Sequence, residues 1–341
     1  MTRRVLIAGV TDSHSLEMSY CKAFLNAGYE VKLYDTALAV KKYARLGKLG
    51  YRIHQFFPVE AWLKKANKEF TEEVKLFMPD ILMVFSGAEI LPGSFAYIKS
   101  ILPTHIIWYW ADPLPNLSRY LLQSVPLSDG IVSYSNSSLK AFNRMGAKSS
   151  CWIPFAADTD THFVKAEARR EYAYDISFIG SWRPEREDAL KIIFENFPEL
   201  RFKVSGPYWN RCQFLPIRKL ASSQPVYGKL FSEIVRDSFL NLNVIDKSNY
   251  PAVNMRFFEI MTAGGLELFS AGPEMENIFI DRKHLLYFST PETLIGAVQF
   301  AFDNKEKMEE IKINGQQLLM QNHLYSHRIQ EVQSFVDNFD C

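Results

Sequence analysis

The stretch "RFFEIMTAGGLELFS" (256–270) places Glu259 inside an apolar run with helical spacing that ends at Gly264 and Gly265. A buried carboxylate needs hydrogen-bond donors. The two adjacent hydroxyls of a ribose could supply them, because one carboxylate can accept both. Arg256 precedes Glu259 by three residues, so it could pair with Glu259 or reach a phosphate. The alternative is a core glutamate satisfied within the protein, followed by an ordinary helix C-terminus.

A second group of chemically capable residues follows a predicted strand at 175–181. Gly180 and Ser181 would allow a ligand to approach the backbone closely at the start of a helix. Arg183 and Arg186 would present forked donors to phosphate oxygens. The alternative is a solvated helix start, in which these arginines pair with the acids that follow them.

Candidate acid–base residues follow two other predicted strands. Asp112 ends the aromatic run "IIWYWAD", where it could act as a general base or accept a hydrogen bond from a sugar hydroxyl. Alternatively, it starts a turn before proline. Asp12 and His14 follow the first strand, at a helix N-terminus that could bind an anion or a hydroxyl. The alternative there is helix capping by Asp12 or Ser13.

Strands and helices alternate along the whole chain, which predicts parallel sheets with helices on both faces. The predicted strands are 4–10, 29–35, 81–87, 104–112, 130–135, 175–181, 201–206, 240–245, 266–271 and 285–289. The predicted helices are 15–28, 60–80, 136–147, 185–196, 230–237 and 254–263, with a helical tail at 291–339. The polar stretch 156–173 interrupts this alternation, so we interpret it as a linker between two Rossmann-like domains. The segment that follows the first strand, residues 9–15, lacks the G-x-G-x-x-G signature, which argues against a dehydrogenase.

Composition excludes several classes of protein. The net charge of +1 gives no general attraction to nucleic acid. The four cysteines are scattered and form no CxxC pair, which disfavours a structural zinc and fits reduced thiols in a cytoplasm. No window of 18 consecutive apolar residues predicts a membrane span, and the apolar run 5–10 is too short for a signal peptide.

The stretch Lys41–Arg52 has an unusual charge pattern, with five lysines or arginines and no acid. It could contact an anionic glycan, a lipid-linked acceptor or a membrane surface. The alternative is a solvated basic helix.

Four segments resemble one family. "NMRFFEIMTAGGLELFSAGPEMENIF" is similar to the nucleotide-sugar segment of GT-B glycosyltransferases, in particular the branch that resembles the spore maturation protein CgeB. "YDISFIGSWRPERE", "GAKSSCWIPFAADTDTHF" and "WYWADP" resemble further segments of that branch. The resemblance implies an α/β GT-B fold, with two Rossmann-like doubly wound domains facing across a cleft. It places the acceptor domain at 1–165, the donor domain at 172–321, and a C-terminal helix at about 322–341 on the first domain.

The resemblance also implies roles for individual residues. Glu259 matches the glutamate that binds the donor ribose, and Tyr227 and Gly228 match the loop that contacts the base. Arg183, Arg186 and the helix that starts at Asn254 would neutralise the leaving diphosphate without a metal. The donor-binding residues expected are Gly180, Ser181, Arg183, Arg186, Tyr227, Gly228, Asn254, Arg256, Glu259, Gly264 and Gly265. Many relatives have a further glutamate eight residues before the one that Glu259 matches, but this chain has Pro251 there. Glu267 lies eight residues after Glu259, within the following strand, so we treat that spacing as coincidence.

Together these patterns predict a cytoplasmic glycosyltransferase that needs no cofactor or metal and moves a sugar from a nucleotide-sugar to a glycan acceptor. Asp112, or else His14 or Asp12, would activate the acceptor. The basic stretch could add a weak contact with the inner face of a membrane. The alternatives are a nucleotide-sugar epimerase of GT-B architecture and a non-catalytic binding scaffold. A periplasmic binding protein would need an export signal, which the start of the sequence lacks.

Overall fold

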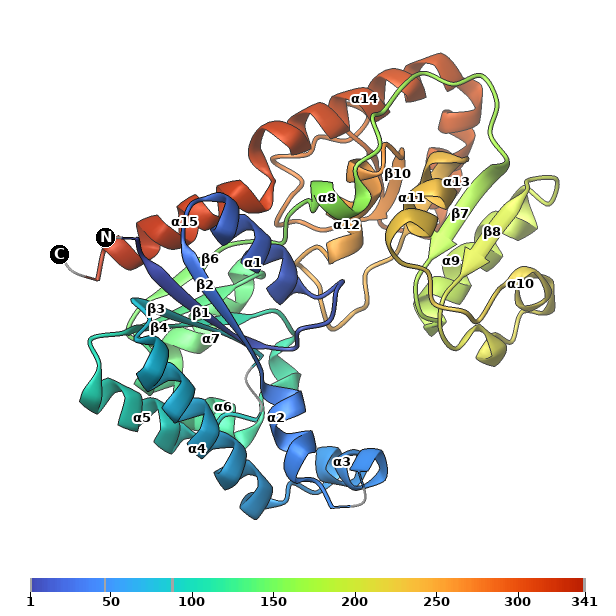
Figure 1. Ribbon diagram of the computed structural model, residues 1–341. Coiled ribbons are helices and arrows are strands. Elements are labelled where there is room, and N and C mark those ends of the chain that lie inside the picture. Colours follow the sequence, from blue (N-terminus) through green and yellow to red (C-terminus); the bar gives the residue numbers. More distant parts are fainter. Residues whose placement is uncertain (1, 46, 87–88, 340–341) are drawn as a thin grey trace. The chain divides into compact units, whose positions relative to one another are not determined.

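The computed structural model describes residues 2–45, 47–86 and 89–339. The chain forms two compact units (Figure 1). Unit 1 comprises Met1–Pro154 and Ser326–Cys341, and unit 2 comprises Phe155–Tyr325. Each unit contains one parallel sheet, which confirms the predicted α/β class with two Rossmann-like domains.

Unit 1 is built on a six-stranded parallel sheet with the strand order β2-β1-β3-β4-β5-β6. Its strands are β1 (Arg4–Gly9), β2 (Glu30–Asp35), β3 (Ile81–Phe85), β4 (His105–Trp110), β5 (Gly130–Ser133) and β6 (Ser150–Trp152). Its helices are α1 (Leu16–Asn26), α2 (Thr36–Tyr43), α3 (Gly47–Phe56), α4 (Glu60–Phe77), α5 (Pro92–Ile101), α6 (Arg119–Ser124) and α7 (Asn136–Arg144). Strand β3 is buried along its whole length, as expected for a strand with both faces covered by helices.

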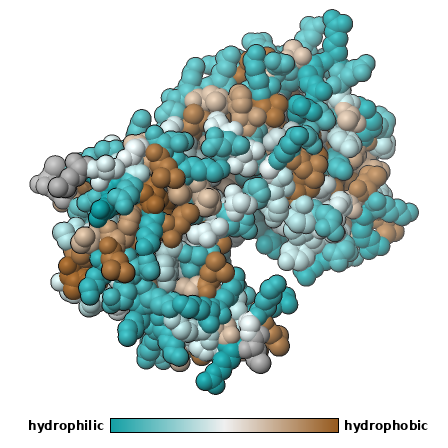
Figure 2. Space-filling model, viewed as in Figure 1, coloured by the Kyte–Doolittle hydropathy of each residue, from teal (hydrophilic) through white to brown (hydrophobic). Residues whose placement is uncertain are grey.

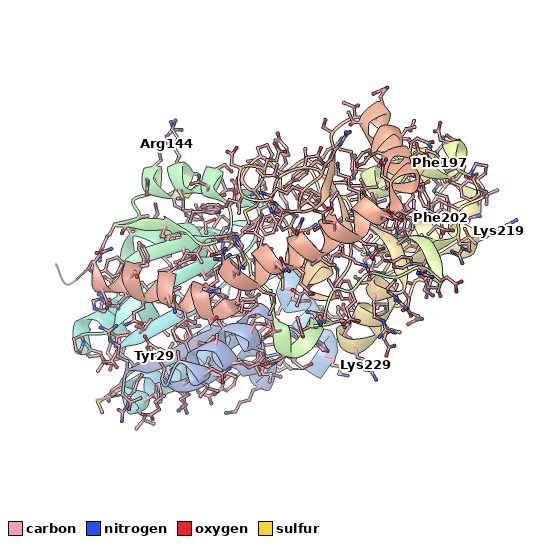
Figure 3. All side chains as sticks on the ribbon, turned by 90° about the horizontal axis from the view of Figure 1, so that it is seen from above. Tyr29, Arg144, Phe197, Phe202, Lys219 and Lys229 are labelled. Carbon is pink, nitrogen blue, oxygen red and sulfur yellow. The ribbon has the colours of Figure 1, made fainter. Side chains whose placement is uncertain are left out.

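The last helix, α15 (Tyr325–Asp337), belongs to unit 1 from Ser326 onward. The hydroxyl of Tyr29, a residue labelled in Figure 3, donates to Oε1 of Gln333 at 2.9 Å. Nη1 of Arg3 lies 2.8 Å from Oδ1 of Asp337. Gly130 allows this packing, because a Cβ there would lie 2.5 Å from the ring of Phe335. These contacts tie the end of the chain to the sheet formed by its beginning.

Unit 2 contains a five-stranded parallel sheet with the order β11-β10-β9-β7-β8. Its strands are β7 (Tyr174–Ile179), β8 (Phe202–Ser205), β9 (Ser238–Asn243), β10 (Glu267–Ser270) and β11 (Leu286–Phe288). Its helices are α8 (Thr159–His162), α9 (Pro184–Asn196), α10 (Leu215–Leu220), α11 (Gly228–Arg236), α12 (Met255–Thr262), α13 (Pro291–Asp303) and α14 (Lys305–Asn322).

The polar stretch 156–173 is not a free linker, because it packs as part of unit 2. It contains the short helix α8, and the amide of Val164 donates to the carbonyl of Thr262 at 3.1 Å. The amide of Ala166 donates to the buried side chain of Gln316 at 2.7 Å. Backbone amides therefore hold this stretch against neighbouring elements of unit 2.

The strand orders identify where a ligand would sit on each unit. In unit 1 the order changes direction between β1 and β3, and in unit 2 it changes between β7 and β9. Ligands of open α/β sheets bind beyond the carboxyl ends of strands at such points. Hydrophilic residues predominate on the face shown in Figure 2, with hydrophobic residues in separate groups. No helix among the described residues is long and apolar enough to cross a membrane.

Candidate functional site

The segments after β7 and β9 meet at the carboxyl edge of the unit 2 sheet. Nε of Arg183 lies 3.2 Å from Oδ2 of Asp246, which follows β9. Arg186 donates through Nη1 to the carbonyl of Ser181 at 2.8 Å, and through Nε to the carbonyl of Val244 at 3.3 Å. Arg183 and Arg186, which follow β7, thus hold the segment that follows the neighbouring strand β9.

The two arginines have different surroundings. The side chain of Arg183 is 56% exposed, so its guanidinium can also reach a ligand. Arg186 is mostly buried, and burial lowers the pKa of its guanidinium. Since Arg186 also donates to the hydroxyl of Ser181 at 2.9 Å, it shapes the Gly180–Ser181 turn. A Cβ on Gly206, after β8, would lie 2.1 Å from the carbonyl oxygen of Gly180, so the two loops approach closely.

Helix α12 carries the predicted ribose-binding glutamate. Nη1 of Arg256 lies 2.5 Å from Oε2 of Glu259, and these side chains are 24% and 13% exposed. The guanidinium of Arg256 also lies 4.4 Å above the ring centre of Phe231 on α11. The pair is therefore fixed in orientation but still reaches solvent. The glutamate has an internal partner, as the alternative in the sequence proposes, without being sealed in the core.

The residues at the start of α11 lie in the same region of unit 2. Tyr227 caps this helix and is 53% exposed, while Gly228 has a φ of 55° and is buried. A hydrophobic cluster of Ile179, Val226, Phe231, Ile234, Val235, Ile260 and Ala263 joins the end of β7 to α11 and α12. This cluster positions Gly180, Tyr227 and the Arg256–Glu259 pair together.

A buried polar network supports the start of α12. Asn254 caps the helix by accepting a hydrogen bond from the amide of Phe257 at 3.1 Å. Its side-chain amide exchanges two hydrogen bonds with that of Asn243, at 2.8 and 3.0 Å. Asn243 in turn donates to Oε1 of Glu267 at 2.7 Å. Thus the position of Asn254 depends on residues at the end of β9 and in β10.

Glu267 is fully buried, and burial raises its pKa well above the ordinary value of 4.5. Its Oε2 atom has no hydrogen-bond partner among the residues that the structure describes. The side chain of Glu267 is consequently enclosed in the core, whereas Glu259 on α12 is partly exposed and paired with Arg256. The sequence shows that these two glutamates are eight residues apart. It does not show that one is fully buried while the other is partly exposed.

Gly264 and Gly265 end α12 in a Schellman motif. The amide of Gly264 donates to the carbonyl of Met261, and that of Gly265 donates to the carbonyl of Ile260. Gly264 has a φ of 71°, which favours glycine. A Cβ there would lie 2.7 Å from the carbonyl of Val164, and one on Gly265 would lie 2.4 Å from the side chain of Val235. Protein atoms thus pack closely against both glycines.

On unit 1, the ends of β3 and β4 bring two polar side chains together. The hydroxyl of Ser86 lies 3.5 Å from Oδ2 of Asp112, and burial raises the pKa of Asp112. Ser86 has a φ of 53°, an uncommon conformation for a residue other than glycine. Ser86 is not among the residues predicted from the sequence, because no local sequence motif indicates that it lies close to Asp112.

Asp12 and His14 lie at the same edge of the sheet, in the exposed segment after β1. The cap of α1 is Ser15, whose hydroxyl accepts from the amide of Met18 at 3.3 Å, so capping by Asp12 or Ser13 is wrong. Asp12 instead accepts from the amide of His14 at 3.4 Å within its own turn.

Two carboxylates outside the predicted site hold the segment that carries Asp12 and His14. Glu17 accepts from the amide of Val10 at 2.9 Å, and Asp35 accepts from the hydroxyl of Thr11 at 2.8 Å. Burial raises the pKa of Glu17. Glu17 lies on α1, directly after this segment, whereas Asp35 is brought to it by the pairing of β2 with β1.

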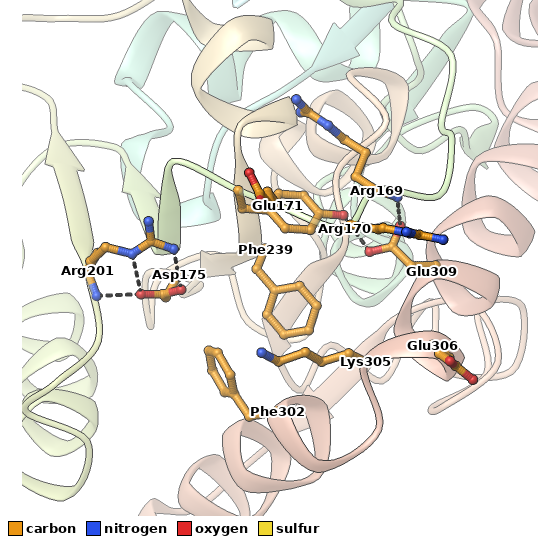
Figure 4. Close-up of a pocket in the computed structure, with 11 residues that line it drawn as sticks. Arg169, Arg170, Glu171, Asp175, Arg201, Phe239, Phe302, Lys305, Glu306 and Glu309 are labelled. Atoms are coloured by element: carbon orange, nitrogen blue, oxygen red, sulfur yellow. Dashed lines mark hydrogen bonds and ion pairs between the residues drawn. The ribbon is translucent and has the colours of Figure 1, made fainter.

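A separate pocket of about 430 Å³ lies at the amino ends of the unit 2 strands (Figure 4). Two of its charged groups pair with each other, since Arg201 donates to both oxygens of Asp175 at 2.8 and 2.9 Å. Glu309 accepts from the hydroxyl of Tyr172 at 2.5 Å. Among the described residues, no three His, Cys, Asp or Glu side chains are grouped as metal ligands.

Comparisons with known proteins bear on the fold and on the second half of the chain. Residues 183–334 match a family model described as glycosyl transferase-like. A search of curated proteins finds no match. The chain is similar in structure to sucrose-phosphate synthase from Thermosynechococcus elongatus, at 11% identity and a TM-score of 0.70 over 99% of both chains. It is also similar to HepE from Anabaena in complex with UDP, at 12% identity and a TM-score of 0.62 over 97% of this chain and 99% of that one.

A third similar structure is a glycosyltransferase from Rickettsia africae, at 11% identity and a TM-score of 0.70 over 99% of this chain and 98% of that one. These likenesses show that the fold is GT-B, as predicted from the resemblance. The match at 183–334 confirms the resemblance to glycosyltransferases, and the narrower resemblance to the CgeB-like branch stays a prediction.

Proposed function

From a chain with the GT-B fold and a glycosyl transferase-like second half, we propose a glycosyltransferase that moves a sugar from a nucleotide-sugar to a carbohydrate acceptor. The observation that carries this proposal is the partly exposed Arg256–Glu259 pair at the same sheet edge as Arg183. A carboxylate that accepts from vicinal hydroxyls, beside guanidinium groups that bind phosphate, suits a nucleoside diphosphate.

Unit 2 would hold the donor. Glu259 would accept hydrogen bonds from the ribose, and Tyr227 would contact the base next to the turn at Gly228. Arg183 and the positive N-terminal end of α12 at Asn254 would stabilise the charge that develops on the leaving diphosphate. Support for a uridine nucleotide comes from HepE, whose structures contain UDP and UDP-glucose. Charge stabilisation by these groups would make a metal ion unnecessary.

Unit 1 would hold the acceptor, a polysaccharide, lipid-linked sugar or other glycan. An acceptor hydroxyl would attack the anomeric carbon while the bond from that carbon to the diphosphate breaks. The nucleoside diphosphate leaves with the bonding electrons, and the proton of the hydroxyl passes to Asp112. Burial raises the pKa of Asp112, which makes its carboxylate a better base than an exposed aspartate. His14 and Asp12 are the alternative bases.

The test has two stages. First, thermal melting of the full chain with nucleoside diphosphates and their sugar derivatives should reveal one donor class that raises the melting temperature. Second, that donor should be consumed when glycan acceptors are added. Free epimer formed without acceptor would replace the proposal with an epimerase. Tight donor binding without turnover, against any acceptor or water, would replace it with a scaffold.

A further inference from the structure

Helix α3 of unit 1, labelled in Figure 1, has buried side chains on one face and exposed side chains on the other. On the inner face, Tyr51 and His54 are 7% and 5% exposed, and the His54 ring stacks 5.7 Å from that of Trp62. The amide of Val59 donates to Nδ1 of His54 at 2.9 Å. Gly50 lets the backbone pass close by, because a Cβ there would lie 1.8 Å from the carbonyl of Arg45. These contacts fix which way the opposite face points.

The outer face is a stripe of large apolar side chains. Leu49, Ile53, Phe56 and Phe57 are 61%, 49%, 80% and 75% exposed. Their spacing of four, three and one places them on one side of the helix and its last turn. Phe57 continues that turn, because its amide donates to the carbonyl of Ile53 at 2.8 Å. Two adjacent phenylalanines with this exposure contribute little to the core of unit 1.

Positive charge lies along one border of this stripe. Residues 41–59 contain no aspartate or glutamate. Lys48 and Arg52 are exposed and precede Leu49 and Ile53 by one residue each, so they lie along one border of the stripe. Nζ of Lys41 lies 4.9 Å from the centre of the Tyr51 ring. Nζ of Lys42 lies 2.6 Å from Oε1 of Glu69. The cations at the border of the stripe are therefore presented to solvent together with the apolar residues.

We propose that α3 docks unit 1 onto an anionic phospholipid surface, with Phe56 and Phe57 inserted between headgroups. An interfacial helix combines an apolar face with flanking lysines and arginines in this way. The cations would meet lipid phosphates, while the apolar side chains leave water. This inference concerns where the protein works and does not depend on the proposed glycosyl transfer. A soluble anionic glycan could also contact the cations and the aromatic rings, but it would give no binding to vesicles.

The experiment measures binding of the full chain to vesicles by co-sedimentation. One vesicle is phosphatidylcholine alone, and the other also contains phosphatidylglycerol. The chain should bind the anionic vesicle, and binding should weaken as salt screens the charges. The double variant Phe56→Ser/Phe57→Ser should bind about tenfold or more weakly. The double variant Lys48→Glu/Arg52→Glu should lose its preference for the anionic vesicle.

Matched controls alter exposed residues elsewhere on unit 1. Leu76→Ser removes a side chain that is 73% exposed on α4, and Lys140→Glu reverses an exposed charge on α7. Both should bind vesicles as the unchanged chain does. The proposal is overturned if the unchanged chain ignores anionic vesicles, or if the phenylalanine pair can be removed without effect. It is also overturned if the pair instead mediates self-association, seen as a dimer that the double variant dissociates without vesicles. Donor-induced melting shifts of the same variants test unit 2 separately.

Discussion

The carboxyl edges of the two sheets share a topology but differ in charge. At the edge of unit 2, Arg183 and Arg256 each pair with a carboxylate. Arg186 donates to the carbonyl of Ser181 in the loop after β7. The segments that follow β1 and β4 in unit 1, residues 10–15 and 111–117, contain aspartates and a histidine but no lysine or arginine. The same fold thus has an edge suited to binding an anion in unit 2 and an edge suited to binding a neutral hydroxyl in unit 1.

This difference has a chemical reason. A leaving diphosphate is stabilised by fixed cations, so arginines belong at the donor edge. A general base must lose its proton readily and take one from the acceptor, and a paired arginine would lower its basicity. The burial of Asp112 without a neighbouring cation in residues 111–117 has the opposite effect, because it raises the pKa of this carboxyl. Substitutions at each edge can test whether the two edges divide the work in this manner.

The largest effect should come from Asp112→Asn. If Asp112 is the base, glycosyl transfer should fall by about 100-fold or more, while the melting shift caused by the donor stays unchanged. Because burial raises the pKa of Asp112, the acidic decline in activity should lie above the ordinary aspartate value of 3.8 and be absent from the variant. The measurement is kcat/KM against pH. An unchanged pH profile would move the role to His14 or Asp12, and Ser86→Ala serves as the neighbouring control.

The next effect concerns Glu259→Ala on the donor edge. Loss of a charged hydrogen-bond acceptor should weaken donor affinity by about 10- to 100-fold and abolish most of the melting shift. The unliganded melting temperature should fall little, since Arg256 stays partly exposed and keeps its contact with the Phe231 ring. Glu199→Ala alters an exposed glutamate of unit 2 and should leave both values intact. If the unliganded variant melts much lower, Glu259 is structural.

Glu267 provides a contrast within the same unit, because it should matter for stability rather than charge. Glu267→Ala should lower the free energy of unfolding by about 2 kcal/mol, since the Asn243 amide loses its acceptor. Glu267→Gln retains an acceptor and should be tolerated better. Denaturant titrations of the unliganded chain would distinguish the two variants.

The same residue predicts a pH dependence of stability. The folded-state pKa of Glu267 lies well above the ordinary 4.5, so the folded state binds its proton more tightly than the unfolded state. The stabilisation is complete below the ordinary pKa and is lost as pH rises from there through the folded-state pKa. Unfolding free energies of the unchanged chain and Glu267→Gln should therefore diverge as pH increases. Parallel curves would mean that Glu267 does not change its protonation on unfolding.

The smallest effect should come from Arg183→Ala. An exposed cation contributes modestly, so donor affinity should weaken by up to about fivefold, and the difference should shrink at high salt. Lys229→Ala removes a cation that is 91% exposed in its side chain at the start of α11 and serves as the control. Equal effects of both substitutions would indicate general electrostatics rather than a phosphate contact at Arg183.

Much of the fold could be predicted because buried parallel strands leave short apolar runs, and the ten predicted strands all exist. The three-residue strand β6 could not be predicted in this way, since its side chains are only partly buried and form no apolar run. The candidate site was harder to predict. Arg183 and Arg186 look equivalent in the sequence, yet only the fold shows that Arg186 faces the carbonyls of Ser181 and Val244.

The sequence by itself determined the alternation of strands and helices, and therefore which residues stand at the carboxyl ends of strands. It also permitted a tight turn at Gly264, because glycine adopts a left-handed backbone without steric cost. Only the tertiary structure decided that Glu267 is a buried acid with a raised pKa, that Ser86 lies close to Asp112, and that Phe56 and Phe57 remain exposed. Local patterns fix backbone conformation, whereas burial, pairing and pKa depend on which distant segments pack around a side chain.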